Sequence, residues 1–425
     1  MSGLEVAVGT PARAGEGPLK RRLGLADAVV IGLGSMIGAG IFAALSPAAR
    51  AAGSGLLLGL AAAAVVAYCN ATSSARLAAR YPASGGTYVY GRERLGDFWG
   101  YLAGWAFVVG KIASCAAMAL TVGSYVWPEQ AHAVAVAAVV ALTAVNYAGI
   151  HKSAWLTRVI VGVVLTVLAA VVVAGLTSGA ADPGRLDVGA DATAGGVVQA
   201  AGLLFFAFAG YARIATLGEE VRDPARTIPR AIPLALGLTL VVYAAVAVSA
   251  LAVLGGAALG DAVAPLAAVV REAGHPGLAP VVRAGAALAA TGSLLALILG
   301  VSRTTLAMAR DRHLPHALAA VHPRFRVPHR AELAVGAVVA ILAATADLRG
   351  AIGFSSFGVL VYYAVANASA WTLGPDEGRP PRAVPAVGLA GCLILAFALP
   401  MSSVVSGAAV LAAGAAVYAL RRAVT

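Results

Sequence analysis

The chain has 425 residues, of which 60% are hydrophobic and 12% charged, and its formal net charge is +11. This composition excludes an ordinary soluble domain and is typical of a membrane protein with many spans. The positive charge does not indicate a nucleic-acid partner, because its placement follows the predicted membrane topology. The three cysteines lie in separate apolar segments without metal-ligand or disulfide spacing. We therefore expect no metal site, and no motif predicts a cofactor.

Residues 1–22 are polar and rich in glycine, alanine and proline, and no apolar core follows a basic start there. This pattern argues against a cleaved signal peptide and predicts a disordered cytoplasmic tail. About twelve apolar segments follow, which predict an all-α integral membrane protein. We expect the spans near residues 27–48, 54–79, 98–127, 131–149, 155–178, 194–217, 231–256, 279–310, 331–347, 351–373, 385–400 and 402–420.

The basic residues test this topology. If both termini are cytoplasmic, 23 of the 30 lysines and arginines fall on the cytoplasmic side and five on the opposite side. The remaining two, Lys111 and Arg213, lie within spans. Basic residues gather on the cytoplasmic side of membrane proteins. We therefore expect a multi-pass protein of the cell membrane, of the bacterial inner-membrane type, with both termini in the cytoplasm.

The first span contains an unusual run, residues 34–42, with the sequence Gly-Ser-Met-Ile-Gly-Ala-Gly-Ile-Phe. Each glycine weakens a helix by about 1 kcal/mol relative to alanine. An opened backbone turn survives in a membrane only where it lines a cavity or is buried in protein. Such a turn directs bare N–H groups into the protein and favours a carboxylate ligand. A face of small residues for close helix packing is the alternative interpretation.

The sixth span carries a similar run, residues 205–211, with the sequence Phe-Phe-Ala-Phe-Ala-Gly-Tyr. Five spans separate the two runs, and this odd number gives the two halves of the chain opposite orientations. Interrupted segments at matching positions of inverted halves are typical of secondary transporters, whose sites lie near the bilayer midplane. The two runs together therefore favour a transport site over simple helix packing.

Further motifs occur in order over about residues 25–370. They are Ile37-Gly38-Ala39-Gly40-Ile41-Phe42, Tyr81-Pro82-Ala83-Ser84-Gly85-Gly86-Thr87-Tyr88, Gly104-Trp105, Gly218-Glu219-Glu220-Val221-Arg222-Asp223-Pro224, Ser302-Arg303, Met308-Ala309-Arg310-Asp311 and Leu314-Pro315. In this ordered set the chain resembles the amino acid permeases of the amino acid–polyamine–organocation (APC) transporter superfamily.

The resemblance implies a fold and a class of function. The fold would be a five-plus-five inverted-repeat core with discontinuous helices 1 and 6, followed by two C-terminal helices. Its first repeat would span residues 23–180, its second residues 190–374, and the accessory helices residues 383–421. The function would be secondary active transport of amino acids or their amines by alternating access, and not an enzymatic reaction.

The resemblance also implies a substrate site built mostly from backbone groups. A substrate carboxylate would meet the N–H groups of Gly38, Ala39 and Gly40. The substrate ammonium would meet carbonyls freed in both breaks, and an aromatic gate would close over it. The residues implied for the carbonyls, the gate and the centre of the second break are Ser35, Met36, Phe205, Phe206, Phe208 and Gly210. The alternative for the phenylalanines is apolar surface that faces the core or lipid.

The chain departs from the family pattern at charged positions in spans 3 and 5. Proton-coupled relatives often carry a lysine in span 5 and a glutamate in span 3, where this chain has Val164 and Gly110. Lys111 lies about 20 Å into its span, where a charge is costly and an ionisable residue is a functional candidate. We hypothesise that Lys111 replaces the missing lysine, braces span 1 against span 8 and couples transport to protons. The alternative is a lysine that bonds helix-end carbonyls and never titrates.

Two hydroxyl residues of span 8, Thr291 and Ser293, are candidates for a coupling-ion or carbonyl contact that faces span 1. The alternative is packing between helices.

Many relatives place an acid beside the aromatic residue of span 6, but here Ala212 follows Tyr211. The missing acid argues against arginine or a polyamine as substrate, because a second ammonium favours a carboxylate partner. Small residues at the breaks favour a neutral amino acid.

Other classes of function receive little support from the sequence. No His-Glu-x-x-His or Gly-x-Ser-x-Gly motif and no pair of mid-span acids indicates an intramembrane enzyme. No ring of one residue type indicates a channel. Three alternatives stay open: an amino acid or amine exchanger, a cationic amino acid transporter, and a membrane sensor that binds an amino acid without moving it. No feature of the sequence predicts an oligomeric state.

Overall fold

The computed structural model describes residues 23–81, 85–149, 154–215 and 221–424. The predicted tail, residues 1–22, and Glu219 and Glu220 of the motif after span 6 lie outside them. The described residues form α-helices, short 3₁₀ turns and no strand, apart from one isolated bridge between Leu23 and Val221. The helices are α1 (Leu25–Met36), α2 (Ala39–Ala43), α3 (Leu45–Ala52), α4 (Leu56–Arg80), α5 (Thr87–Leu95), α6 (Asp97–Val126), α7 (Ala131–Tyr147), α8 (Ala154–Leu176), α9 (Ala194–Phe208), α10 (Ala212–Ala215), α11 (Pro224–Asp261), α12 (Pro265–Glu272), α13 (Ala279–Arg310), α14 (His329–Thr345), α15 (Leu348–Trp371), α16 (Ala383–Ala398) and α17 (Met401–Val424).

The helices have the lengths that a membrane requires. Ten helical segments of the described chain are long and apolar enough to cross a bilayer. Expected spans nine and eleven correspond to the shorter helices α14 and α16, which have 17 and 16 residues. These helices pack against α7 and α15, respectively. The predicted all-α membrane protein is therefore confirmed.

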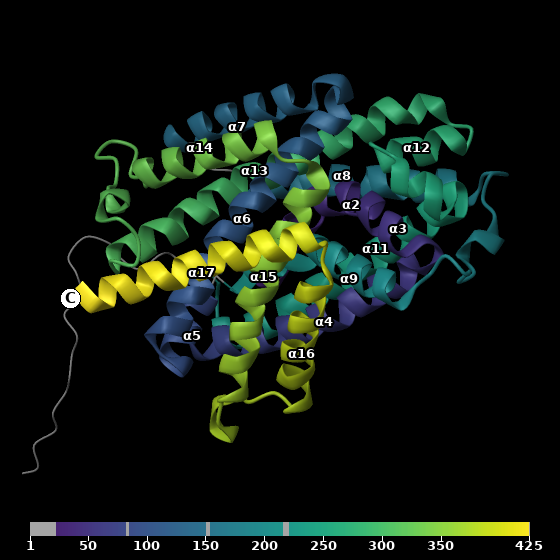
Figure 1. The fold of residues 1–425 in the computed structure, drawn as a ribbon. Coiled ribbons are helices and arrows are strands. Elements are labelled where there is room, and N and C mark those ends of the chain that lie inside the picture. The colour runs from purple at the N-terminus through teal and green to yellow at the C-terminus, as the bar shows by residue number, and fades with distance from the viewer. Residues whose placement is uncertain (1–22, 82–84, 150–153, 216–220, 425) are drawn as a thin grey trace, which may run out of the picture.

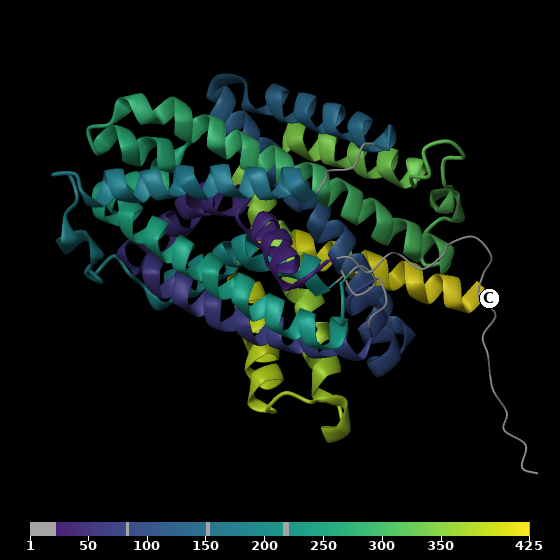
Figure 2. The same cartoon turned by 180° about the vertical axis from the view of Figure 1, so that it is seen from behind.

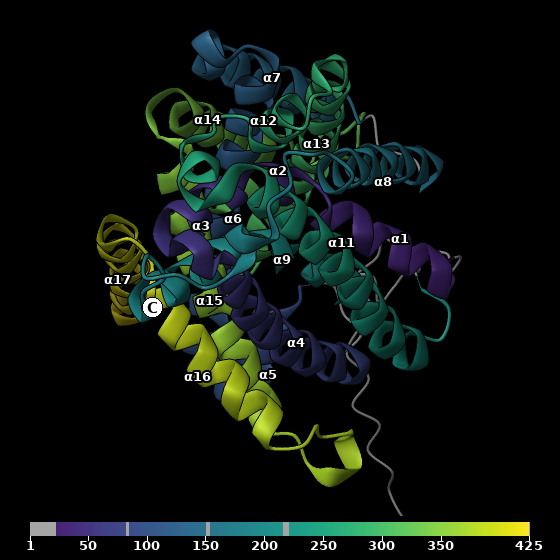
Figure 3. The same cartoon turned by 90° about the vertical axis from the view of Figure 1, so that its right-hand side faces the viewer.

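The 30-residue helix α6 lies at the centre of the molecule. It packs most extensively against α13 and α15 and also contacts α5, α7 and α14. Helices α7, α13 and α14 lie side by side as one layer (Figures 1 and 2). We call this the α7–α13–α14 layer. Helices α1, α4, α9 and α11 pack together on the other side of α6, and α17 runs along the outside (Figure 3).

Local sequence signals set several helix starts. The Thr193 hydroxyl accepts a hydrogen bond from the Gly196 N–H at 3.0 Å and caps α9, and Asp347 caps α15 in the same way through Gly350. Such caps satisfy N–H groups that the first helical turn leaves without partners. Pro224 opens α11, where its missing N–H costs nothing.

A polar clamp joins two motifs that are far apart in the sequence. The Tyr88 hydroxyl, at the end of the Tyr-Pro motif, donates to the Asp311 carboxylate at 2.6 Å. The Arg92 guanidinium pairs with the same carboxylate at 3.1 Å. The His313 Nδ1 atom lies 2.8 Å from the Tyr88 oxygen. The clamp therefore fixes α5 to the end of α13.

The clamp predicts a loss of stability in acid. Burial lowers the pKa of His313 below its usual value of 6.5, so the folded protein keeps this imidazole neutral while the unfolded chain protonates it. We therefore expect thermal stability to fall as the pH decreases below about 6.5, and to fall less in His313→Gln. Thermal melts of the detergent-purified protein from about pH 8 to pH 5 measure this difference. The exposed His275→Gln serves as the control, and equal pH profiles for wild type and His313→Gln would contradict the prediction.

Candidate functional site

The first helix is interrupted where the sequence predicts it. Helix α1 ends at Met36 and α2 begins at Ala39. Between them Ile37 has φ −80° and ψ 57°, the conformation at the centre of an inverse γ-turn. The Gly38 N–H accordingly donates to the Met36 carbonyl at 2.8 Å. The break is a tight turn that ends one helix and starts another.

The second interruption follows the phenylalanine run. Helix α9 ends at Phe208, a 3₁₀ turn covers Ala209–Tyr211, and the short helix α10 follows. The Ala209 N–H still bonds the Phe205 carbonyl, so the helix loosens only after that point. Both discontinuous helices implied by the family resemblance are thus present.

The two interruptions touch each other through their glycines. A Cβ atom on Gly40 would lie 2.6 Å from the Ala207 Cα atom, and one on Gly210 would lie 2.7 Å from the Met36 nitrogen. Real Cβ atoms do not approach other atoms this closely, so these positions require glycine. The glycines therefore serve close packing as well as opening the helices, which unites the two interpretations of the sequence.

Tyr243 on α11 connects the two breaks, and sequence reasoning missed it. Its hydroxyl lies 2.5 Å from the Met36 carbonyl oxygen and 3.0 Å from the Ala207 carbonyl oxygen, and donates to both. Its ring centroid lies 5.2 Å from that of Phe208. The available signal was one tyrosine within the apolar run 231–256, because a buried tyrosine hydroxyl needs a partner.

Lys111 reaches the second break from α6. Its side chain is 7% exposed, and its Nζ atom donates to the Ala209 carbonyl at 3.3 Å. An ammonium has three donors, and Ala209 is the acceptor that the structure gives it. The contact that joins α13 to the first break is made by Ser293, whose Oγ atom donates to the Gly34 carbonyl at 3.4 Å. Besides α11, which bonds both breaks, α6 thus bonds the second break and α13 the first.

The backbone donors expected for a carboxylate divide into two groups. The Gly38 N–H is used within the γ-turn. The N–H groups of Ala39 and Gly40 occupy the first two positions of α2, where a helix offers no carbonyl partner. No hydrogen bond from either group occurs within the described ranges. These two donors are the ones available to an anionic group.

The remaining predicted side chains lie near the breaks with different partners. Ser35 donates to the Ile31 carbonyl of its own helix at 2.9 Å. Phe205, Phe206 and Phe208 are all buried, so in this conformation they are core residues. Thr291 is half-buried and makes no hydrogen bond to either break in the part of the chain that the structure describes.

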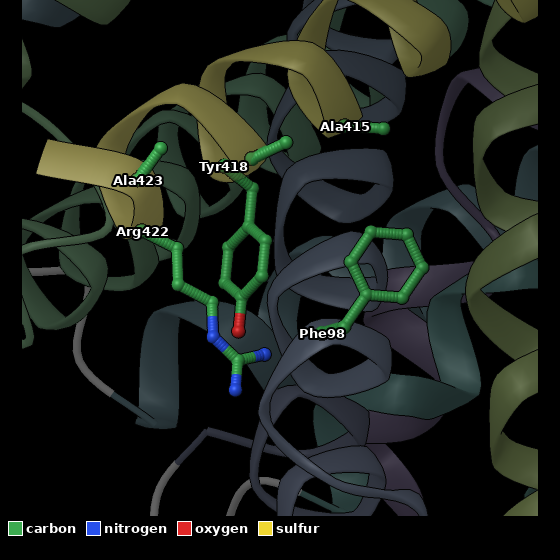
Figure 4. Close-up of a pocket in the computed structure, with 6 residues that line it drawn as sticks. Phe98, Ala415, Tyr418, Arg422 and Ala423 are labelled. Carbon is green, nitrogen blue, oxygen red and sulfur yellow. The ribbon is translucent and has the colours of Figure 1, made fainter.

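A hollow at the surface lies away from the breaks. It has a volume of about 440 Å³ and is lined by the start of α6 and the end of α17, including Phe98, Tyr418 and Arg422 (Figure 4). Phe98 precedes Lys111 by about 20 Å along α6. This hollow is therefore not part of the arrangement at the breaks.

Comparison with known proteins gives consistent matches over most of the chain. The family model described as amino acid permease matches residues 23–420. An uncharacterised transporter of Mycobacterium tuberculosis is 80% identical over 407 residues, which cover 96% of this chain and 92% of the relative. A branched-chain amino acid permease of Bacillus subtilis is 26% identical, with 96% and 94% covered. The human cationic amino acid transporter 4 is 29% identical, with 86% and 62% covered.

The close contact of Gly40 with α9 predicts that alanine lowers stability at this position but not at a glycine with open space around it. In Gly40→Ala the new methyl group would overlap α9, so we expect a loss of about 1–3 kcal/mol of stability through overpacking. Gly300→Ala on α13 is the matched control, because its Cβ would meet nothing within 4 Å. Alanine favours a helix by about 1 kcal/mol over glycine, so the control keeps or gains stability. Thermal melts of the two purified variants measure this difference, and equal melting temperatures would contradict the prediction.

Removal of the Tyr243 hydroxyl, which bridges the two breaks, is predicted to lower the stability of the protein. Tyr243→Phe keeps the ring but removes a hydroxyl donor from two buried carbonyls, of which Met36 keeps its bond from the Gly38 N–H, so we expect a loss of about 1–3 kcal/mol. Tyr68→Phe on α4 is the control, because Tyr68 is 53% exposed. Thermal unfolding of both variants tests the prediction. A Tyr243→Phe protein as stable as its control would show that the hydroxyl does not hold the breaks.

Proposed function

Because the chain belongs to the amino acid permease family, we propose that it carries a neutral amino acid across the cell membrane by alternating access, with protons as the coupling ion. The chain is a multi-pass membrane protein and an amino acid transporter. The observation that carries the proposal is the direct contact of two interrupted helices, each held through a carbonyl oxygen by a different neighbour.

The chemistry of the breaks supports a zwitterionic, neutral substrate. The free N–H groups of Ala39 and Gly40 favour the substrate carboxylate. Segments 34–42 and 205–215 contain no aspartate or glutamate. A cationic side chain of the substrate would therefore find no acid within either segment, and the small residues Ala39 and Ala207 leave an apolar surface.

The hydrogen bonds suggest which parts move. Tyr243 belongs to α11, which packs with α1, and it bonds both breaks. Lys111 and Ser293 belong to α6 and α13, and each bonds one break. We propose that the breaks and α11 move together relative to α6 and α13. In that motion the Lys111 and Ser293 bonds open while the Tyr243 bonds persist.

Lys111 supports proton coupling through the same contact. A protonated ammonium holds the Ala209 carbonyl by a charge-assisted hydrogen bond, which is stronger than a neutral one. Loss of the proton weakens this bond and frees the second break. Binding and release of a proton at Lys111 would thus control how readily the second break moves, and with it the substrate.

The competing proposals are exchange of amino acids and transport of cationic substrates, as in the name of the human relative.

We expect uptake of a neutral amino acid into proteoliposomes to follow an imposed pH gradient and to ignore sodium. The assay uses labelled alanine, leucine and arginine, with and without sodium and with and without preloaded amino acid. In Lys111→Met we expect the response to the pH gradient to disappear. Lys152→Met, which changes a lysine between expected spans, is the matched control.

Other results would contradict specific parts of this proposal. Uptake of arginine alone would contradict the substrate class. Uptake that needs sodium or a preloaded amino acid would contradict proton coupling. An unchanged pH response in Lys111→Met would show that this lysine has a structural role and does not couple transport to protons.

A further inference from the structure

The α7–α13–α14 layer contains a buried carboxyl group that the transport proposal does not use. Glu332 on α14 has no exposed surface, and neither carboxylate oxygen has a hydrogen-bond partner among the described residues. Burial of an unpaired charge is among the most costly arrangements in a protein. An ionisable residue in such a place within a membrane protein is a candidate for function.

Helices α7 and α14 run antiparallel along each other. At one end of the pair, the His132 Nδ1 atom lies 2.8 Å from the Ala343 carbonyl oxygen. At the other end, the rings of Tyr147 and His329 lie 6.3 Å apart. The start of each helix therefore lies beside the end of the other, and the two contacts fix the register.

This register places Asn146 opposite Glu332. Between the two ends, Thr143 packs on Gly336, where an added Cβ would lie 2.6 Å from the Thr143 Oγ1 atom. Asn146 follows Thr143 by three residues toward the end of α7, and Glu332 precedes Gly336 by four toward the start of α14. All four residues are buried, and Asn146 and Glu332 each lie about one helical turn from the Thr143–Gly336 contact, toward the same end of the pair.

The orientation of the Asn146 amide is fixed by α13. Its Nδ2 atom donates to the Leu295 carbonyl at 3.1 Å. A carbonyl can only accept, so the amide nitrogen must face α13, and the amide oxygen Oδ1 faces away. That Oδ1 atom is buried and has no partner within the described segments. The layer thus presents an unsatisfied acceptor at the level of Glu332.

Only one protonation state of Glu332 suits this acceptor. An ionised carboxylate offers acceptors alone, whereas a carboxylic acid has one O–H donor. The neutral acid can donate to Asn146 Oδ1, and the ionised form would repel it. Deprotonation would therefore favour rotation of the amide, which takes Nδ2 away from the Leu295 carbonyl.

The surrounding charged groups do not supply another partner. Arg303 on α13 is exposed and forms no ion pair with Glu332 in the described part of the chain, although its positive charge favours the ionised carboxylate and so opposes the effect of burial. The Nδ1 atom of His329, one turn before Glu332, is buried without a partner there as well. The other charged or titratable groups on elements packed against α14 are His132 and Tyr147 on α7, Lys111, Asp97, Tyr101, Cys115 and Tyr125 on α6, Arg283 and Arg310 on α13, His316 in the 3₁₀ turn His316–Ala319, His322 in the preceding loop, and Arg330 on α14 itself.

We propose that Glu332 and Asn146 form a proton-binding site in the α7–α13–α14 layer, separate from Lys111 at the breaks. A proton binds a Glu332 carboxylate oxygen, and the resulting O–H group donates to Asn146 Oδ1. Leu295 lies two residues after Ser293, which bonds the first break. Rotation of the amide therefore changes the hydrogen bonding of α13 close to the substrate site. This last consequence rests on the proposed transport function, whereas the proton site does not.

The proton site is tested by infrared difference spectroscopy of the full-length protein in lipid, with protons as the only ligand. We expect the C=O stretch of a buried carboxylic acid at neutral pH, with a shift in D₂O. Glu332→Gln should lose this band, and the exposed Glu129→Gln should keep it. Asn146→Leu should shift the band without removing it. Equal spectra for wild type and Glu332→Gln, or a band that depends on sodium or potassium, would overturn the proposal.

The link to transport has a separate measurement. In proteoliposomes that take up a labelled amino acid, we expect Glu332→Gln to lose part of the pH dependence of the rate at a constant gradient, while Glu129→Gln retains it. A wild-type pH profile in Glu332→Gln would overturn the link to α13. If the wild-type protein transports none of the amino acids, the proposed function is refuted but the proton site is not, because the infrared experiment needs no substrate.

Discussion

Backbone groups inside a membrane must find partners within the protein, and this requirement governs the centre of the structure. Two helices are interrupted side by side, and each interruption removes hydrogen bonds that a continuous helix would make. The molecule replaces them one at a time: a tyrosine from α11, a lysine from α6 and a serine from α13 each donate to a freed carbonyl. Because the substitutes come from different helices, every one of them ties the breaks to a neighbour.

The same requirement explains why the site contains so few polar side chains. Carbonyls and N–H groups of the breaks supply the polar chemistry, and the glycines bring the two backbones into contact. The α7–α13–α14 layer contrasts with this arrangement, because it contains a buried acid and an amide whose oxygen has no partner among the described residues. A change of protonation in such an apolar layer has strong consequences, since electrostatic interactions are stronger in low-dielectric surroundings than in water.

The sequence predicted the features that depend on local composition. The glycine runs predicted both interruptions, and hydropathy predicted the helical membrane protein. The partners of the breaks were not predictable, because they depend on which helix faces which. Tyr243 and Met36 are 207 residues apart, and Lys111 was expected to brace spans 1 and 8 but contacts Ala209. The proposed pairing of Asn146 with Glu332 likewise depends on the register of two helices, which no local pattern encodes. The repeat boundaries and substrate contacts remain predictions.

The Tyr243 hydroxyl has one hydrogen but faces two carbonyls, Met36 on the first interrupted helix and Ala207 on the second. A single hydrogen can be fully engaged with only one of them at a time. If one helix moves away, the hydrogen passes wholly to the other, and the net loss is a fraction of a hydrogen bond, below about 1 kcal/mol. The tyrosine therefore tolerates a small separation of the two helices, because its hydroxyl stays bonded to one of them throughout.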